Sequence, residues 1–375
     1  MNTLSKRALS KRNTSYDVIC CVALLCILAM RFFEGTGFYE EYMNKPSIYF
    51  TTLLRNLFPI GIPLLLILAG AQLRKQELSK AYYLSGLKFL LVYVLASLAC
   101  GFFRRYYYPE GLSLSAIFWS IPGFSTTPDS WYVEMFAGLF LLIPFLNLIY
   151  NNLDTDRKKL ILVGTLVFLT ALPGTLNSFS LSFLPAKLEG FAGVRKPLIP
   201  EWWTGIYPIT YYFVGCYLSE HPLKVKKWVC GLLYGVSVLL FSALCVRKSY
   251  GWPFIEGEWA SLGSVFLLVP AASVFLFFQN INCGKLPALL RKGFRAVAEC
   301  WLGIFLICYI FETVFSDLLV EKVPEFTSRL PYFFLLVPLV FVLSLACAYI
   351  LNLLCQLIAS LLIRFKAKKE PSQAS

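Results

Sequence analysis

Ionisable side chains inside otherwise apolar segments are the residues of this chain that could carry chemistry. Asp17 and Arg31 lie at the two ends of the first apolar segment, and Glu134 begins a later one. Carboxylates can take up a proton during catalysis. Because a charged group within a membrane segment is costly, such residues are functional candidates by default. Asp17 and Arg31 would lie about 21 Å apart along one helix, so they are not expected to pair.

Each of these charges also has a structural explanation. Asp17 could satisfy the amino end of its helix, and Arg31, Arg55 and Lys88 could extend to lipid headgroups. The aromatic pair before Glu134 predicts a shallow position for that carboxylate. Further carboxylates on the ninth apolar segment have the same two explanations, namely Glu299, Glu312 and Asp317.

Twelve cysteines and a single histidine, His221, complete the set of reactive side chains. Most of the cysteines fall in apolar runs, where a thiol packs as a small apolar group. No closely spaced Cys and His set has the geometry of a zinc site, so we expect neither a disulfide framework nor a metal. His221 precedes Pro222 in a lysine-rich connection, which favours a solvated loop position.

The segments that must position these groups are too apolar for a soluble domain. Of the 375 residues, 58% are hydrophobic and 15% are charged, whereas soluble domains have about 25% charged residues. A run of about 20 apolar residues crosses a bilayer as a helix. We therefore predict an all-α, polytopic membrane bundle of about ten transmembrane helices, at residues 16–33, 56–73, 83–103, 131–150, 160–177, 202–218, 228–246, 260–279, 299–319 and 332–363.

Proline and glycine modify two of the predicted helices, and one connection has an apolar stretch of its own. Gly61-Ile62-Pro63 predicts a break in the second helix, which is tolerated when the helix packs inside the bundle. Pro173 and Gly174 predict an interruption near the end of the fifth helix. The connection after the third helix contains an apolar stretch at 112–121 that could lie flat on the membrane interface.

The positions of the basic residues predict the orientation of the bundle. With the amino terminus in the cytoplasm, the cytoplasmic connections contain about twice as many Lys and Arg residues as the external ones. Both termini are then cytoplasmic, with a basic segment at 1–15, a membrane domain at 16–363 and a tail at 364–375. The net charge of +13 arises from such short clusters, so the expected partner is the lipid bilayer and no nucleic acid is expected.

Several stretches of the chain resemble membrane acyltransferase family 3, over about residues 14–360. The most specific is WYVEMFAGLFLLIPFLN at 131–147, and weaker matches lie at 15–23, 61–70 and 209–218. Members of this family are multi-helix O-acyltransferases that modify surface polysaccharides, peptidoglycan and lipid-linked sugars. The resemblance implies a bacterial plasma membrane protein that transfers an acetyl-like group to a hydroxyl of a lipid-linked or surface glycan.

The resemblance also implies the donor and part of its site. The acyl group would come from a cytoplasmic acyl-CoA or similar thioester, used as a co-substrate, with no cofactor bound. The basic pair that follows the second helix in the family corresponds here to Lys80 and Lys88. We expect these two lysines to bind the donor.

The chain departs from the family where the family keeps its histidine base. In the first helix the family has an arginine and, eleven residues later, a histidine; the matching residues here are Cys20 and Arg31. A second histidine of the family corresponds to Cys308. A guanidinium stays protonated and cannot replace a base, whereas a thiol beside a cation could accept an acyl group. The expected catalytic set is Asp17, Cys20, Arg31, Glu134 and Cys308.

Two classes of function follow from these departures. The first is an active O-acyltransferase with an altered site. The second is a family member that has lost the transfer chemistry and acts as a binding, translocating or scaffolding membrane protein. A shared cavity lined by the expected catalytic set would favour the first class, and a scattered set would weaken both.

Overall fold

The computed structural model describes residues 13–177, 199–223, 225–281 and 283–369, and this part of the chain is helical with no β-sheet. Two isolated bridges, between Tyr42 and Pro253 and between Met43 and Tyr250, are its only β-type pairings. The basic residues predicted at the amino terminus lie outside the described residues, as does most of the connection at 178–201. The fold is therefore the predicted helical bundle.

Each of the ten predicted segments coincides with a helix. Within the described ranges, seven helical segments are long and apolar enough to cross a membrane, so this is a multi-pass membrane bundle. Ten crossings and two cytoplasmic termini stay predictions. The ten helices are α2 (Thr14–Gly35), α4 (Gly61–Leu73), α5 (Lys80–Tyr107), α7 (Ser130–Asn151), α8 (Asp156–Leu176), α9 (Tyr207–Glu220), α10 (Lys227–Ser249), α11 (Val265–Gln279), α13 (Trp301–Lys322) and α15 (Phe333–Lys369).

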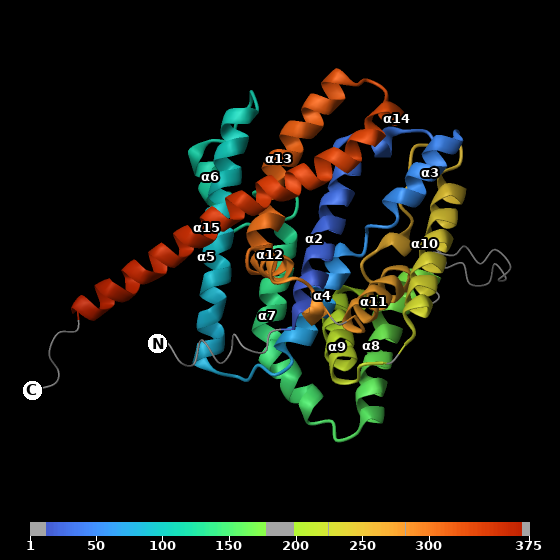
Figure 1. Cartoon of the computed structure of the whole chain (residues 1–375). Coiled ribbons are helices and arrows are strands. Elements are labelled where there is room, and N and C mark those ends of the chain that lie inside the picture. Colours follow the sequence, from blue (N-terminus) through green and yellow to red (C-terminus); the bar gives the residue numbers. More distant parts are fainter. Residues whose placement is uncertain (1–12, 178–198, 224, 282, 370–375) are drawn as a thin grey trace, which may run out of the picture.

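Helix α2 forms the centre of the bundle. It begins at an N-cap, where the Asn13 side chain accepts a hydrogen bond from the Ser15 amide, and such a cap satisfies one free amide of the first turn. Helices α4, α11, α12 (Ala288–Glu299), α13 and α15 pack around it. Figure 1 shows α2 between α5 on one side of the bundle and α10 on the other. Residues on α2 are therefore placed to meet several other helices.

The breaks predicted within two helices are not found there. Gly61-Ile62-Pro63 does not break the second helix; it begins α4, and the preceding residues form turns after α3 (Pro46–Arg55). Proline suits the first turn of a helix because the amide it lacks would have no partner there. Pro173 is accommodated inside α8, which continues to Leu176. The stretch at 112–121 contains a short helix, α6 (Leu114–Ser120).

A break that was not predicted separates α12 from α13 at Cys300. The ninth segment was predicted to run from 299, with Glu299 inside it. Glu299 instead ends α12, a helix with a basic exposed side at Arg291 and Lys292 and a buried side at Val297. The break leaves Cys300 as the N-cap residue of α13.

Loops at one end of the bundle are tied together by Arg329, which ends the short helix α14 (Phe326–Arg329). The guanidinium donates to the carbonyl oxygens of Val323 at 2.6 Å, Pro324 at 2.6 Å and Thr36 at 2.7 Å. The Arg329 side chain is buried, so it supplies hydrogen bonds to carbonyl oxygens that water would not reach. The contact joins the connection after α2 to the one after α13.

We expect Arg329→Met to lower the free energy of unfolding by about 2–4 kcal/mol, because three buried carbonyl oxygens lose a charged donor. Thermal unfolding in detergent, followed by Trp fluorescence, measures the change. Lys322→Met is the control, since Lys322 is exposed and should leave the melting temperature unchanged. Equal melting temperatures for the two variants would contradict a structural role for Arg329.

Candidate functional site

An ion cluster forms where the family pattern has its first histidine. Arg31, near the end of α2, donates from Nη1 to Glu312 Oε2 on α13 at 3.2 Å, and its Nη2 pairs with Asp129, the N-cap residue of α7. The side chains of Arg31, Glu312 and Asp129 are 8%, 11% and 19% exposed. One buried cation thus joins three helices through two carboxylates. We call these three residues the ion cluster.

Cys308 lies beside the ion cluster, so two of the five expected catalytic residues are brought together. It is close enough to Arg31 and Glu312 to interact with both electrostatically, and it stands one helical turn before Glu312. The Cys308 thiol is fully buried and donates to the carbonyl oxygen of Phe305 at 3.1 Å. Its proton is therefore directed into its own helix rather than toward an open space.

The other three expected catalytic residues are not part of the cluster. Asp17 and Cys20 are buried near the opposite end of α2, about 21 and 17 Å from Arg31 along the helix axis. Glu134 is exposed on α7, one turn beyond Asp129. The expected set of five therefore does not line one cavity.

The chemistry open to the ion cluster is limited by its own pairing. Arg31 cannot act as a base because a guanidinium stays protonated. Glu312 and Asp129 could take a proton, but both are held by Arg31. The arrangement suits a tie between helices better than proton transfer. Sequence reasoning missed Asp129, although an aspartate directly before a helix start is a recognisable cap position.

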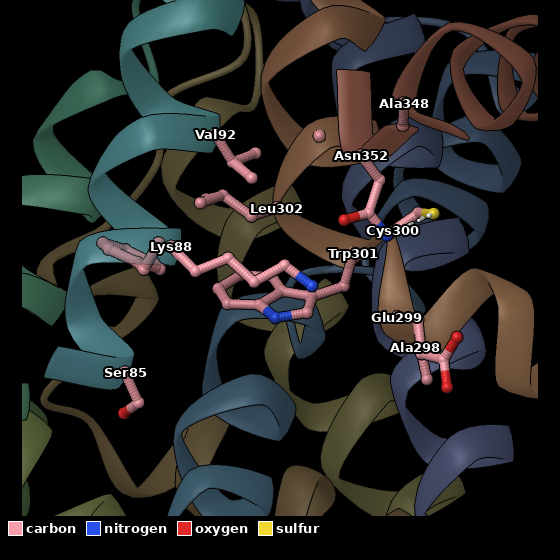
Figure 2. Close-up of a pocket in the computed structure, with 12 residues that line it drawn as sticks. Ser85, Lys88, Val92, Ala298, Glu299, Cys300, Trp301, Leu302, Ala348 and Asn352 are labelled. Atoms are coloured by element: carbon pink, nitrogen blue, oxygen red, sulfur yellow. Dashed lines mark hydrogen bonds between the residues drawn. The ribbon is translucent and has the colours of Figure 1, made fainter. Parts of the chain in front are cut away.

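A pocket of about 220 Å³ lies between α5, the α12–α13 junction and α15. Figure 2 shows Lys88 extending from α5 toward Trp301, with Asn352 and Cys300 on the other side of the pocket. Its lining also includes apolar side chains, Val92 and Leu302 among them. A few polar groups among apolar ones are the usual make-up of a small-molecule site.

The polar groups of this pocket contact one another. Asn352 Nδ2 donates to Cys300 Sγ at 3.8 Å, and Lys88 is close enough to Cys300 to interact electrostatically. Glu299, at the rim, pairs with Arg295 at 3.0 Å. Lys88, which we expected from the sequence to bind the donor, lines this pocket. Sequence reasoning missed Cys300 because the break between α12 and α13 was not predicted.

The pocket and the ion cluster are separate sites on α13. Trp301 begins that helix at the pocket, and Glu312 follows eleven residues later, which is about 17 Å along the axis. Lys80, the other lysine expected to bind a donor, is the first residue of α5 and does not line the pocket. Among the described residues, no group of Cys, His, Asp and Glu could hold a metal ion.

The most specific stretch of the family resemblance ends at a structural residue. Asn147, on α7, donates from Nδ2 to the carbonyl oxygens of Leu73 at 2.9 Å and Gln76 at 2.8 Å. Its Oδ1 accepts from the Tyr212 hydroxyl at 2.7 Å. Asn147 thus fixes the end of α4 against α7 and α9. The stretches at 131–147 and 209–218 meet at this contact.

The comparison with protein families gave one match over most of the chain. A family model described as an acyltransferase domain matches residues 13–352. No curated protein and no solved structure matched. The matched range includes the ion cluster and every residue of the pocket, up to Asn352.

Proposed function

Because the chain belongs to membrane acyltransferase family 3, we propose that it is an integral membrane enzyme that acylates glycans. It moves an acetyl-like group from a cytoplasmic thioester donor to a hydroxyl of a cell-envelope glycan, at the plasma membrane of a bacterium. The observation that carries this proposal is a pocket with a cation, an amide and a thiol, within a chain of this family. The pocket is the proposed donor site.

The lining of the pocket supports a thioester donor. A donor such as acetyl-CoA has phosphates at one end and a narrow arm that ends in the thioester. Lys88 lines the pocket and is exposed on α5, so it can meet a phosphate of the donor at the rim. A pocket of about 220 Å³ with both apolar and polar lining residues suits the arm rather than the whole donor.

Acyl transfer by the purified protein tests the proposal directly. Full-length protein in proteoliposomes is given radiolabelled acetyl-CoA, and release of free CoA is followed with and without membrane extracts that contain lipid-linked glycans. We expect release that depends on the extract. In parallel, envelope glycans from cells with and without the protein are compared by mass for an acyl difference. No release and no acyl difference would contradict an enzymatic function.

Lys88→Gln is expected to raise KM for acetyl-CoA about 10- to 100-fold, because one charged hydrogen bond to the donor is lost. The matched control is Lys80→Gln, on the same helix but outside the pocket, which should change KM little. Initial rates of CoA release measure both variants. Equal effects of the two substitutions would place the donor on the surface of α5 rather than in the pocket.

A family member without transfer activity is the second candidate function. The observation that favours it is the ion cluster, which occupies the position of the family's histidine with a paired arginine. In this case the pocket still binds the thioester, so acetyl-CoA raises the melting temperature of the protein while no CoA is released. Release of CoA above the rate in empty vesicles would exclude this alternative.

A further inference from the structure

Cys300 is the one cysteine that lines the pocket between α5, α13 and α15. It is the N-cap residue of α13, a helix of 22 residues, and its side chain is 5% exposed. The partial positive charge of a helix amino end stabilises a thiolate. The break that ends α12 therefore places a thiol where a long helix begins and a cavity opens.

Two groups from other helices act on the Cys300 sulfur. Lys88 on α5 supplies a positive charge within electrostatic reach, and the Asn352 amide on α15 donates a hydrogen bond to Sγ at 3.8 Å. Both interactions favour the thiolate over the thiol. Among the described residues, three helices thus converge on one sulfur atom, with a cation, an amide and a helix amino end. The Glu299 carboxylate and the carboxyl end of α12, where Cys300 is also the C-cap residue, act in the opposite direction.

The same asparagine points to a ligand. Asn352 Oδ1 is buried and has no hydrogen-bond partner in the described part of the chain. A buried carbonyl oxygen without a donor is costly. The arm of a CoA thioester carries amide N–H groups, which are donors of the required kind. A donor that enters the pocket could satisfy Oδ1 and bring its thioester to Cys300.

We propose that Cys300 accepts the acyl group from the donor and carries it as an acyl-cysteine intermediate. This inference rests on the proposed function for the identity of the donor. Cys300 Sγ attacks the thioester carbonyl carbon; an S–C bond forms, the bond from that carbon to the donor sulfur breaks, and the donor leaves as a thiol with the Cys300 proton. In the second half, the acceptor hydroxyl oxygen attacks the acyl-cysteine, and its proton returns to Cys300.

The exchange needs no added oxidant or cofactor. One thioester replaces another in the first half, so the energy of the acyl bond is kept. The acyl group then remains in the membrane protein after the donor leaves, and donor and acceptor need not occupy the pocket together. A pocket of about 220 Å³ suits such alternate use. The second half forms an oxygen ester from a thioester, and the thioester is the more reactive of the two.

The environment of Cys300 predicts how acylation depends on pH. Burial raises the pKa of the Cys300 thiol above its ordinary value, and the neighbouring Glu299 carboxylate raises it further, while the hydrogen bond from Asn352 and the charge of Lys88 act against this rise. The reactive thiolate is therefore the minor form at neutral pH, and its fraction grows as the pH rises. We expect the rate of acyl-cysteine formation to increase with pH between about 7 and about 9, because the raised pKa keeps the thiolate the minor form over most of this range, and we expect Lys88→Gln to lower the rate at each pH.

Acyl-cysteine formation is tested on the full-length protein in detergent. The protein is mixed with radiolabelled acetyl-CoA, quenched in acid and digested, and the labelled peptide is identified by mass spectrometry. We expect a hydroxylamine-sensitive acetyl group on Cys300 and at least a tenfold loss of label in Cys300→Ala. The control is Cys355→Ala, a buried cysteine of α15 within electrostatic reach of Lys88 but outside the pocket, which should keep the label.

A second measurement does not depend on the folding of a variant. In the wild-type protein, acetyl-CoA should slow alkylation of Cys300 by iodoacetamide at least fivefold and leave alkylation of Cys347 unchanged, because Cys347 lies outside the pocket. Protection without a covalent label would show that the donor binds at Cys300 and does not acylate it, which overturns the inference.

The outcomes also separate this inference from the proposed function. Transfer of acetyl to glycan without label on Cys300, and with Cys300→Ala fully active, overturns the acyl-cysteine and leaves the acyltransferase. Label on Cys300 without any transfer to a hydroxyl supports the acyl-cysteine and overturns the glycan acyltransferase. If Cys300 is neither labelled nor protected from alkylation, and no acetyl group is transferred to glycan, the acyl-cysteine and the proposed function are both contradicted.

Discussion

Replacement of Arg31 by methionine is expected to lower the free energy of unfolding by about 3–5 kcal/mol, because it leaves two carboxylates inside the bundle without their cation. Glu312 and Asp129 both pair with Arg31 and come from different helices. The loss would therefore separate α2 from α7 and α13 as well as leave a buried charge. Thermal unfolding of the purified protein in detergent measures it.

A second substitution tests whether the loss of stability comes from the carboxylates that Arg31→Met leaves unpaired. Combining Arg31→Met with Glu312→Met replaces one buried ion pair by apolar groups, which is often close to neutral for stability. We expect the double variant to recover part of the loss, because Glu312 no longer leaves an unpaired carboxylate while Asp129 still lacks its cation. Lys158→Met is the surface control, since Lys158 and Asp154 form an exposed pair, and such pairs contribute little.

A different substitution of Arg31 distinguishes a structural role of the ion cluster from a catalytic one. Arg31→His restores the residue type of the family pattern, but a histidine carries less positive charge at neutral pH than an arginine. With a structural cluster, Arg31→His lowers the melting temperature and does not increase CoA release. An increase in CoA release with an unchanged melting temperature would show instead that the cluster is an altered catalytic site.

The positions of the membrane helices could be predicted because hydropathy is a local property. All ten predicted segments coincide with helices, since each is an apolar run of nearly the required length. Their ends were predicted less well. The second segment was placed at 56–73, and its helix begins at Gly61; the ninth was placed from 299, and its helix begins at Trp301. Neither end follows from hydropathy, because the flanking residues are themselves apolar.

The partners of the charged residues could not be predicted because they are distant in the chain. Arg31 and Glu312 are 281 residues apart, and each alone has an adequate structural explanation at a membrane interface. Pairing depends on which faces of α2 and α13 meet, and apolar helices that are buried on several sides carry no strong facial pattern. The pocket depends likewise on three helices, and its thiol lies at a break without proline or glycine.

The stretches that resemble the family contain residues that pack helices together as well as candidate catalytic residues. The stretch at 131–147 ends at Asn147, and the stretch at 209–218 contains Tyr212, and these two side chains are hydrogen-bonded at 2.7 Å. The 61–70 stretch ends at Gly70, where α4 crosses α9. Three separate stretches are thus used in one junction of α4, α7 and α9. The junction explains why the resemblance survives although the histidines are absent.

Gly215→Ala is expected to destabilise the protein by at least about 3 kcal/mol, beyond the usual range for an added methyl group, because the obstacle is backbone. A Cβ atom at Gly215 would lie well inside 3.0 Å of the Ile67 carbonyl oxygen, and one at Gly70 would lie as close to the Tyr212 carbonyl oxygen. Neither oxygen can move aside without separating α4 from α9. Small residues permit such close crossings in membrane proteins.

The control for this substitution is Gly235→Ala on α10, where an added Cβ meets nothing within 4 Å. Alanine is the better helix former, so Gly235→Ala should leave stability unchanged or raise it slightly. The yield of monodisperse protein in detergent and the melting temperature measure both variants. If Gly215→Ala kept the wild-type melting temperature, α4 and α9 would not cross through their glycines, and the junction at Asn147 could not be what the family-like stretches maintain.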